Sequence, residues 1–303
     1  MKFKTVLMAI AIGGSMLSCN EAKGPEGKSG KELSEIIGKA DPSVAQGKMT
    51  AEVLHSFGRV GSMSVSPDRK QILYQVTYIS IPENKSNNEL FIMKSDGSHR
   101  KQLTITNTQE SNAQWIDGGR KIAFLSNETG SSQIWTINPD GGGMTQISNQ
   151  KEPIEGFVIS PDGKKVLFIR SVKSGKKPGE QYADLPGASG RVVDDLMYKH
   201  WDHWVESVPH PFLADLEGNR LNNIVDLLEG EPYEAPLAPF GGIEQLAWSP
   251  DGSTIAYTSR KKTGKEYAES TNSDIYFYDL ASGETRNMTE GMMGYDVNPQ
   301  FSP

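Results

Sequence analysis

The chain has 303 residues, of which 36% are hydrophobic and 23% charged, and its formal net charge is −7. This is enough chain for one large β domain or two smaller domains, and it is too apolar for a disordered protein. The negative balance provides no broad basic face that could neutralise a phosphate backbone, which argues against a nucleic-acid partner.

The first residues have the order of a bacterial export signal. Lys2 and Lys4 precede an apolar run over residues 6–12, and small residues then lead to Cys19, the one cysteine of the chain. The run is too short to span a bilayer as a stable helix. Because the order resembles a lipobox, we expect residues 1–18 to be removed as a signal peptide and Cys19 to carry lipid. The protein would then be anchored in the periplasm or at the outer membrane.

An ordinary secretory signal with an incidental cysteine is the alternative interpretation. With a single cysteine the chain forms no internal disulfide. Residues 19–48 are rich in glycine, lysine and glutamate. We interpret them as a tether with at most a short helix near residues 31–37.

A repeat occupies the rest of the chain and predicts its architecture. In each copy an apolar residue precedes Ser-Pro-Asp-Gly or a variant of it, and an apolar triplet such as Ile-Ala-Tyr follows. Proline presets a turn dihedral and glycine accepts a positive φ, so each copy predicts two strands joined by a tight turn. Four copies align without gaps, at residues 65–74, 115–124, 159–168 and 248–257, and a fifth begins at Phe301.

A second hairpin follows three of these copies. Alternating apolar residues lead to Asp-Gly or Ser-Gly turns at residues 89–97, 133–141 and 274–283. Together with a closing strand, each unit then has four strands, which predicts the blade of a β-propeller. The expected fold class is therefore all-β: an incomplete propeller of about four blades and the start of a fifth.

The spacing of the repeat defines the blade boundaries. We assign the partial propeller to residues 49–303, with blades near residues 60–110, 111–152, 153–238 and 239–297 and a truncated blade at 298–303. The third blade is about twice as long as the second and clearly longer than the fourth. We interpret the excess as an insertion, because only one further strand pair is visible there, within residues 211–228.

Rarer pieces of the sequence are more specific than the repeat, which by itself resembles that of TolB-like propellers and names no function. These pieces lie at residues 198–204, 232–236, 239–242, 267–275 and 294–299. Together they resemble the propeller of dipeptidyl-peptidase 5-like members of the prolyl oligopeptidase family, over about residues 49–303. The resemblance implies an α/β-hydrolase domain after the propeller, which supplies Ser, Asp and His and removes dipeptides from peptide N-termini.

The serine nucleophile of such a hydrolase domain stands in a Gly-x-Ser-x-Gly turn between a strand and a helix. That pentapeptide is absent from this sequence, and the nearest match, residues 187–190, lies in a loop rich in proline and glycine. We therefore assign no catalytic residue and expect the chain alone to hydrolyse nothing. We also expect no cofactor.

The insertion of the third blade holds the best candidate for a binding site. Its aromatic and imidazole side chains form the densest such cluster in the chain and, in the family-based interpretation, help to place a short peptide substrate. Acidic side chains beside them would bind its ammonium group. A packed aromatic strand with hydrogen-bonded histidines is the alternative, and for any single residue it is favoured. The candidates are Tyr198, His200, Trp201, His203 and Trp204, with Asp194, Asp195 and Glu206 as the acidic partners.

Metal binding is disfavoured, although the spacing of His200 and His203 is compatible with a pair of ligands. On one strand, residues three apart point to opposite faces, and no third or fourth ligand is evident. The aspartates of the repeated turns are better explained as acceptors for their own backbone than as calcium ligands.

An unfinished propeller leaves blade faces and strand edges without neighbours, so we expect self-association of the isolated chain. The first functional hypothesis is the non-catalytic, peptide-gating half of an exported serine dipeptidyl peptidase. The alternative is a stand-alone TolB-like propeller lipoprotein that binds a protein or glycan partner. An open reading frame that continues past the Pro303 codon into further blades and a Gly-x-Ser-x-Gly turn would select the peptidase.

Overall fold

The computed structural model describes residues 36–42, 44, 47–175 and 178–302. The expected signal peptide, Cys19 and most of the expected tether, including residues 31–35 of its short helix, lie outside these residues. No helix in the described part of the chain is long and apolar enough to cross a membrane.

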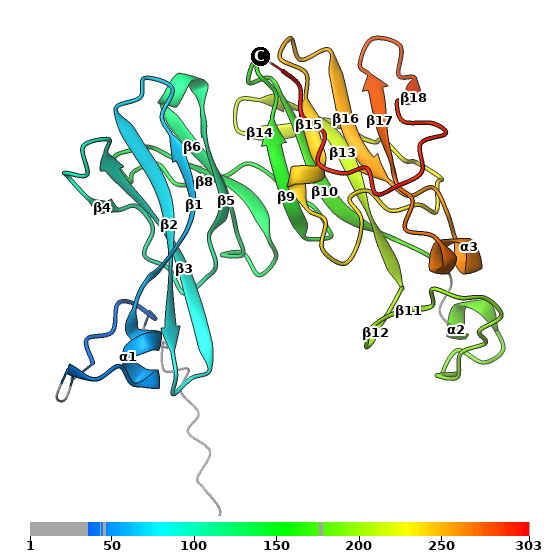
Figure 1. The fold of residues 1–303 in the computed structure, drawn as a ribbon, viewed down its shortest axis with the longest axis horizontal. Helices are drawn as coiled ribbons and strands as arrows, with labels where there is room; N and C mark the ends of the chain where they lie inside the picture. The colour runs from blue at the N-terminus through cyan, green and yellow to red at the C-terminus, as the bar shows by residue number, and fades with distance from the viewer. Residues whose placement is uncertain (1–35, 43, 45–46, 176–177, 303) are drawn as a thin grey trace, which may run out of the picture. The chain divides into compact units, whose positions relative to one another are not determined.

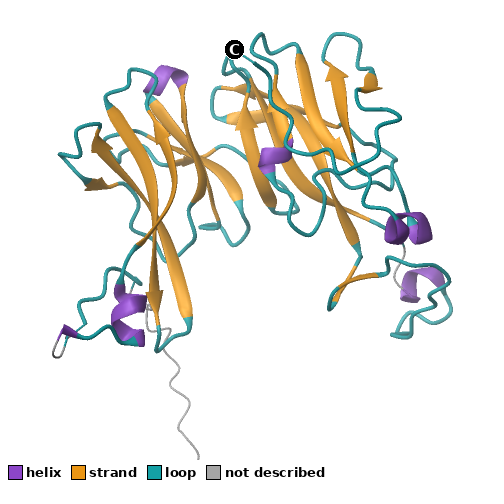
Figure 2. Ribbon diagram, in the orientation of Figure 1, coloured by secondary structure: helices purple, strands orange, loops and turns teal. Residues whose placement is uncertain are grey.

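Four antiparallel sheets of four strands each follow one another along the chain, and we call them blades 1 to 4 (Figures 1 and 2). The all-β architecture of four-stranded blades is thereby confirmed. Blade 1 contains β1 (Arg59–Val65), β2 (Gln71–Ser80), β3 (Lys85–Lys94) and β4 (Lys101–Gln102). Blade 2 contains β5 (Ser111–Ile116), β6 (Lys121–Ser126), β7 (Gln133–Ile137) and β8 (Thr145–Gln146).

The third blade is interrupted between its second and third strands. It contains β9 (Ile154–Ile159), β10 (Lys165–Lys173), β13 (Ser207–Glu217) and β14 (Arg220–Asp226). Blade 4 contains β15 (Leu246–Trp248), β16 (Thr254–Ser259), β17 (Asp274–Asp279) and β18 (Thr285–Asn287). The remaining elements are α1 (Ala51–Ser56), α2 (Pro178–Gln181), α3 (Gly264–Glu269), the two-residue strands β11 (Lys199–His200) and β12 (His203–Trp204), and the 3-10 turns Asp117–Gly119 and Ile243–Gln245.

The aspartates of the repeated turns act as local acceptors. Asp68 Oδ1 accepts from the hydroxyl of Ser66 at 2.6 Å and from the backbone N–H of Lys70 at 3.1 Å. The same pair of bonds recurs at Asp162 and Asp251. These hydrogen bonds stabilise the carboxylate form and lower the pKa of all three side chains, that of Asp251 to about 2. The aspartates therefore close turns, as the sequence indicates.

Apolar side chains bury the faces between consecutive blades. Leu73 and Leu90 of blade 1 share one cluster with Ile122 and Phe124 of blade 2. A second cluster joins blades 2 and 3, and a third joins blades 3 and 4. Because an isolated sheet exposes an apolar face, each blade depends on its neighbour for burial.

The tryptophans of the repeat add a polar link between blades. The indole Nε1 of Trp115 donates to the backbone oxygen of Ser64, in the first strand of blade 1, at 3.1 Å. Trp248 makes the equivalent bond to the backbone oxygen of Val158 in blade 3 at 3.4 Å. The repeat residue that ends a first strand thus also fastens its blade to the preceding one.

The outer faces of the first and last blades differ in how far they are covered by other residues. Val60, Met63 and Val65 of β1 are exposed, and none of the three apolar clusters among the described residues joins blade 4 to blade 1. At blade 4, the ring of Phe301 lies 5.3 Å from that of Phe277, so the last described segment covers part of β17. The blades are not closed into a complete propeller.

Replacement of Phe168 tests the packing between blades. Its side chain is fully buried in the cluster of blades 2 and 3 and stacks on Phe212 at 5.5 Å. We expect Phe168→Ala to reduce the free energy of unfolding by about 3–5 kcal/mol, because it removes apolar contacts and leaves a cavity. Urea unfolding followed by circular dichroism measures the change. Phe240→Ala, at an exposed phenylalanine, is the matched control, and an equal loss in both variants would contradict the packing argument.

Candidate functional site

The insertion of blade 3 connects β10 to β13 and carries every sequence-predicted site residue. It contains α2 and a small hairpin formed by β11 and β12. Both lie beside α3 at the same end of blades 3 and 4 (Figure 1). The insertion therefore lies next to residues that are distant from it in the sequence, such as those of α3.

We expected His200 and His203 to lie on one strand, and this expectation is wrong. They are directly paired across the β11–β12 hairpin, and Trp201 and Asp202 form its turn. His203 is exposed and its Nε2 lies 3.2 Å from the carboxylate of Asp202, whereas His200 is half-buried. No group of three or more potential metal-ligating side chains occurs in the described residues.

Trp204 lies between two cationic side chains. The guanidinium carbon of Arg191 is 4.2 Å from the centroid of its ring and the Nζ of Lys199 is 4.6 Å away, both within cation–π range. Tyr198 contacts the same indole, with 6.0 Å between ring centroids. Arg191 also forms an ion pair with Glu206. Glu206 therefore has a cationic partner within the protein and is a poor candidate for binding a substrate ammonium group.

Trp201 contacts Phe240. Their rings are 5.6 Å apart in an edge-to-face arrangement. Trp201 is 74% exposed and Phe240 is 81% exposed, although both are large apolar side chains. Phe240 follows blade 3 in the chain, so the contact joins the tip of the hairpin to a loop outside the insertion.

A buried polar cluster lies behind the hairpin. Glu234, only 6% exposed, accepts a hydrogen bond from the hydroxyl of Tyr267, and the Arg260 guanidinium stacks on the Tyr267 ring at 4.0 Å. Burial raises the pKa of Glu234, against the opposing effects of Tyr267 and Arg260. His200 lies against the other side of this cluster, with its ring 5.9 Å from that of Tyr267. Burial, together with Arg260, lowers the pKa of His200, which favours the neutral imidazole.

The two remaining acidic candidates differ in position. Asp194 is exposed and faces no group of the cavity described below. Asp195 lies against Gly264, the first residue of α3, where any Cβ would meet the Asp195 carboxylate. Gly264 also has a φ of +54°, which disfavours a larger residue. Glycine at this position thus permits the close approach of α3 to the insertion.

A cavity of about 150 Å³ lies between the insertion, the segment that carries Glu234 and helix α3. Its wall includes His200, Glu234 and Tyr267 on the polar side and Leu196, Met197 and Val208 on the apolar side. A space of this size holds a small side chain or a chain terminus. Of the sequence-predicted residues only His200 lines it; Trp201 lies with Phe240 apart from it, and Glu234, Tyr267, Arg260 and Phe240 were not selected from the sequence.

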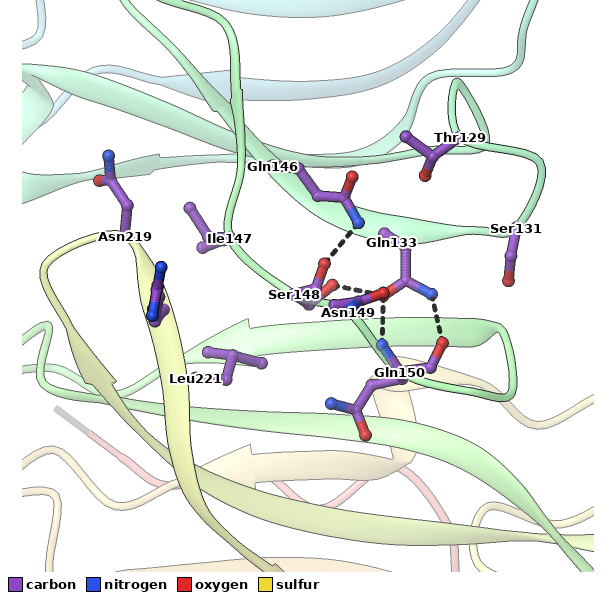
Figure 3. A pocket seen from close by; sticks show the side chains of 11 residues that line it. Thr129, Ser131, Gln133, Gln146, Ile147, Ser148, Asn149, Gln150, Asn219 and Leu221 are labelled. Carbon is purple, nitrogen blue, oxygen red and sulfur yellow. Dashed lines mark hydrogen bonds between the residues drawn. The ribbon is translucent and has the colours of Figure 1, made fainter.

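A second recess, of about 690 Å³, has a different chemistry. Amide and hydroxyl side chains of blade 2 and residues 219–221 of blade 3 form its wall (Figure 3). Gln133 accepts from the Ser148 hydroxyl at 2.8 Å and from the backbone N–H of Gln150 at 2.9 Å. Gln133 and Ser148 thus satisfy each other, whereas the buried hydroxyl of Ser131 has no hydrogen-bond partner among the described residues.

Comparison with known proteins agrees with the fold. A family model described as the TolB beta propeller domain matches residues 43–192. The chain is 49% identical over 273 residues to Dipeptidyl-peptidase 5 of Porphyromonas gingivalis, an alignment that covers 88% of this chain. The chain belongs to the dipeptidyl-peptidase 5-like branch of the prolyl oligopeptidase family. A protein of the same name from Porphyromonas endodontalis is 47% identical over 255 residues, covering 84% of this chain.

The dipeptidyl-peptidase 5-like chain spans only part of these relatives. It covers 40% of the Porphyromonas gingivalis protein and 37% of the Porphyromonas endodontalis protein. Among solved structures, an acylaminoacyl peptidase from Pyrococcus horikoshii superposes with a TM-score of 0.54 at 16% identity, over 78% of this chain and 33% of that one. This likeness shows the fold alone.

Removal of the Tyr267 hydroxyl tests the buried cluster. In Tyr267→Phe the Glu234 carboxylate loses a donor, which we expect to cost about 1–3 kcal/mol of unfolding free energy at neutral pH. The variant raises the pKa of Glu234 further, so its deficit is smallest where the folded wild-type Glu234 is still protonated and grows as pH rises through its raised pKa, which lies above the ordinary value of 4.5. Chemical unfolding at pH 4 to 8 measures this profile. Tyr182→Phe, at an exposed tyrosine, is the control, and a deficit that does not depend on pH would contradict the assignment.

Proposed function

We propose that this chain is the propeller portion of an exported serine dipeptidyl peptidase or oligopeptidase, and that it positions short peptides for an α/β-hydrolase domain of the whole enzyme. The observation that carries the proposal is the 49% identity to Dipeptidyl-peptidase 5 over nearly the whole chain. The sequence has no Gly-x-Ser-x-Gly turn of its own, so its contribution is to binding and access.

The exposed aromatic pair supports a role in contacting peptides. Trp201 and Phe240 remain largely exposed although burial would stabilise them. Aromatic side chains supply large, rigid apolar contact area and are enriched where proteins bind other chains. In this proposal they contact an apolar side chain of the substrate outside the cavity.

The cavity supports a role in holding the end of a peptide. Asp195 lies near it, and its Oδ1 accepts only from the adjacent backbone N–H of Leu196 among its described bonds. Glu234 lines the interior. A carboxylate in a partly dry recess attracts a substrate ammonium group. Of the acidic candidates, Asp195 and Glu234 fit this task better than Glu206, which already pairs with Arg191.

Export and lipid attachment remain part of the proposal. We expect the protein expressed with its own N-terminus to incorporate labelled fatty acid and to enter the membrane fraction. Cys19→Ala removes the thiol that would carry the lipid, so the variant should lose the label and leave that fraction. Metabolic labelling followed by fractionation measures both. Equal labelling of the wild-type protein and the variant would exclude Cys19 as the lipidated residue.

Kinetics of the whole enzyme test the peptide-positioning role. In the full-length protein, Trp201→Ala and Phe240→Ala should each raise KM for dipeptidyl fluorogenic substrates roughly tenfold, since each removes apolar contact area. The kcat should change little. Tyr182→Ala is the control in the same insertion. This 303-residue chain alone should show no turnover, and inhibitor-sensitive hydrolysis by it would overturn the proposal.

A further inference from the structure

Glu110 stands at the boundary between blades 1 and 2. The segment between β4 and β5 is fastened to blade 1 by bonds from Glu110: its N–H donates to the backbone oxygen of Asn88 at 3.0 Å, and its own backbone oxygen accepts from Asn88 Nδ2 at 2.6 Å. Its side chain reaches blade 2, where Oε1 accepts from the hydroxyl of Ser126 at 3.0 Å. One residue therefore connects both sheets.

A second carboxyl group is buried beside it. Glu89 of β3 is 1% exposed and Glu110 is fully buried, and Thr106 bridges their carboxyl groups: its backbone N–H donates to Glu89 Oε1, and its hydroxyl lies 2.9 Å from Glu110 Oε1 and 3.1 Å from Glu110 Oε2. Glu89 Oε1 accepts from Asn87 Nδ2 at 2.8 Å and from the backbone N–H of Thr106 at 2.9 Å. Glu89 Oε2 is also buried, and no N–H, hydroxyl or amide donor is bonded to it.

Among the described residues, no lysine, arginine or histidine forms an ion pair with Glu89 or Glu110. Burial raises the pKa of both groups, that of Glu110 to about 7 with a further contribution from Glu89. Within the part of the chain that the structure describes, the ionisable side chains near the pair include Tyr78 of β2, whose pKa is raised by burial, and Glu128 beyond β6, which lies 3.4 Å from the Thr108 hydroxyl.

We propose that Glu89 and Glu110 hold one proton between them, donated by Glu110 to Glu89 Oε2, and that loss of this proton loosens the interface between blades 1 and 2. We call an interface between two consecutive blades a seam. Two adjacent buried carboxylates cannot both be charged without a large cost, so sharing one proton removes the repulsion and supplies the missing donor. When the proton leaves for water, both carboxylates are charged, and strand β3 and the segment before β5 repel each other.

The sign of the pH effect follows from proton linkage. Folded Glu110 keeps its proton up to a pH of about 7, whereas in the unfolded chain it loses the proton near its ordinary pKa of 4.5. The folded state therefore binds more protons between these values, and its stability falls as pH rises through this window. The seam is tightest in acid and loosens toward neutral and alkaline pH.

The test compares the wild-type chain with Glu110→Gln and Glu89→Gln. An amide is uncharged at every pH, and in either variant it prevents the double charge. We expect the wild-type Tm to fall as pH rises from 5 to 8.5 more steeply than in both variants, and Glu110→Gln to equal or exceed the wild type at pH 8.5. Glu284→Gln, at an exposed carboxylate on blade 4, is the control and should keep the wild-type slope. An equal fall of Tm with pH in the wild type and in Glu110→Gln would overturn the proposal.

Hydrogen exchange and infrared spectroscopy add readouts that do not depend on a folded variant. Corrected for intrinsic rates, amide exchange in peptides covering residues 86–90 and 106–112 of the wild type should quicken above pH 7, while exchange in β16 stays constant. The infrared band of a protonated carboxylic acid should persist at pH 6 and vanish by pH 8.5. Absence of that band at pH 6 would overturn the proposal. Stabilisation by added calcium at pH 8.5 in the wild type, but not in Glu110→Gln, would replace the proton by a metal ion and overturn it too.

Discussion

The structure depends on one constraint: each sheet has an apolar face that must be covered by the next sheet. Three clusters meet it in turn, between blades 1 and 2, 2 and 3, and 3 and 4. Within them, fully buried residues such as Phe124 and Phe168 come from the second strand of each blade, which lies inside its sheet. Interior strands thus carry much of the packing, and the edge strands β4 and β8 are only two residues long.

Polar groups at the seams refine this packing. Trp115 and Trp248 donate to the first strand of a preceding blade, so the indole both packs and satisfies a backbone oxygen. The Glu89 and Glu110 pair lies at the seam of blades 1 and 2, and no cationic side chain of the described residues forms an ion pair with it. A seam held partly by such a pair responds to protonation, whereas the apolar cluster between blades 2 and 3 does not.

The candidate site lies where the repeat is broken. The insertion of blade 3, the segment that carries Glu234 and the helix that carries Tyr267 are all departures from the regular unit, and they meet around one cavity. The regular strands of the blades hold these three irregular segments in position. In this division the blades supply burial, and the irregular segments supply the chemistry of the proposed peptide-binding site.

The sequence by itself determined the all-β fold, the four-stranded blade and the role of the turn aspartates. These follow from contacts between residues near in sequence, such as Ser66 with Asp68, and a repeat displays them several times. It also identified the insertion and the family resemblance. Only the tertiary structure decided that His200 and His203 face each other across a hairpin, that Arg191 neutralises Glu206, and that Glu234 and Tyr267 join His200. Those contacts join segments up to 67 residues apart in the sequence, and no local pattern records which distant segments will meet.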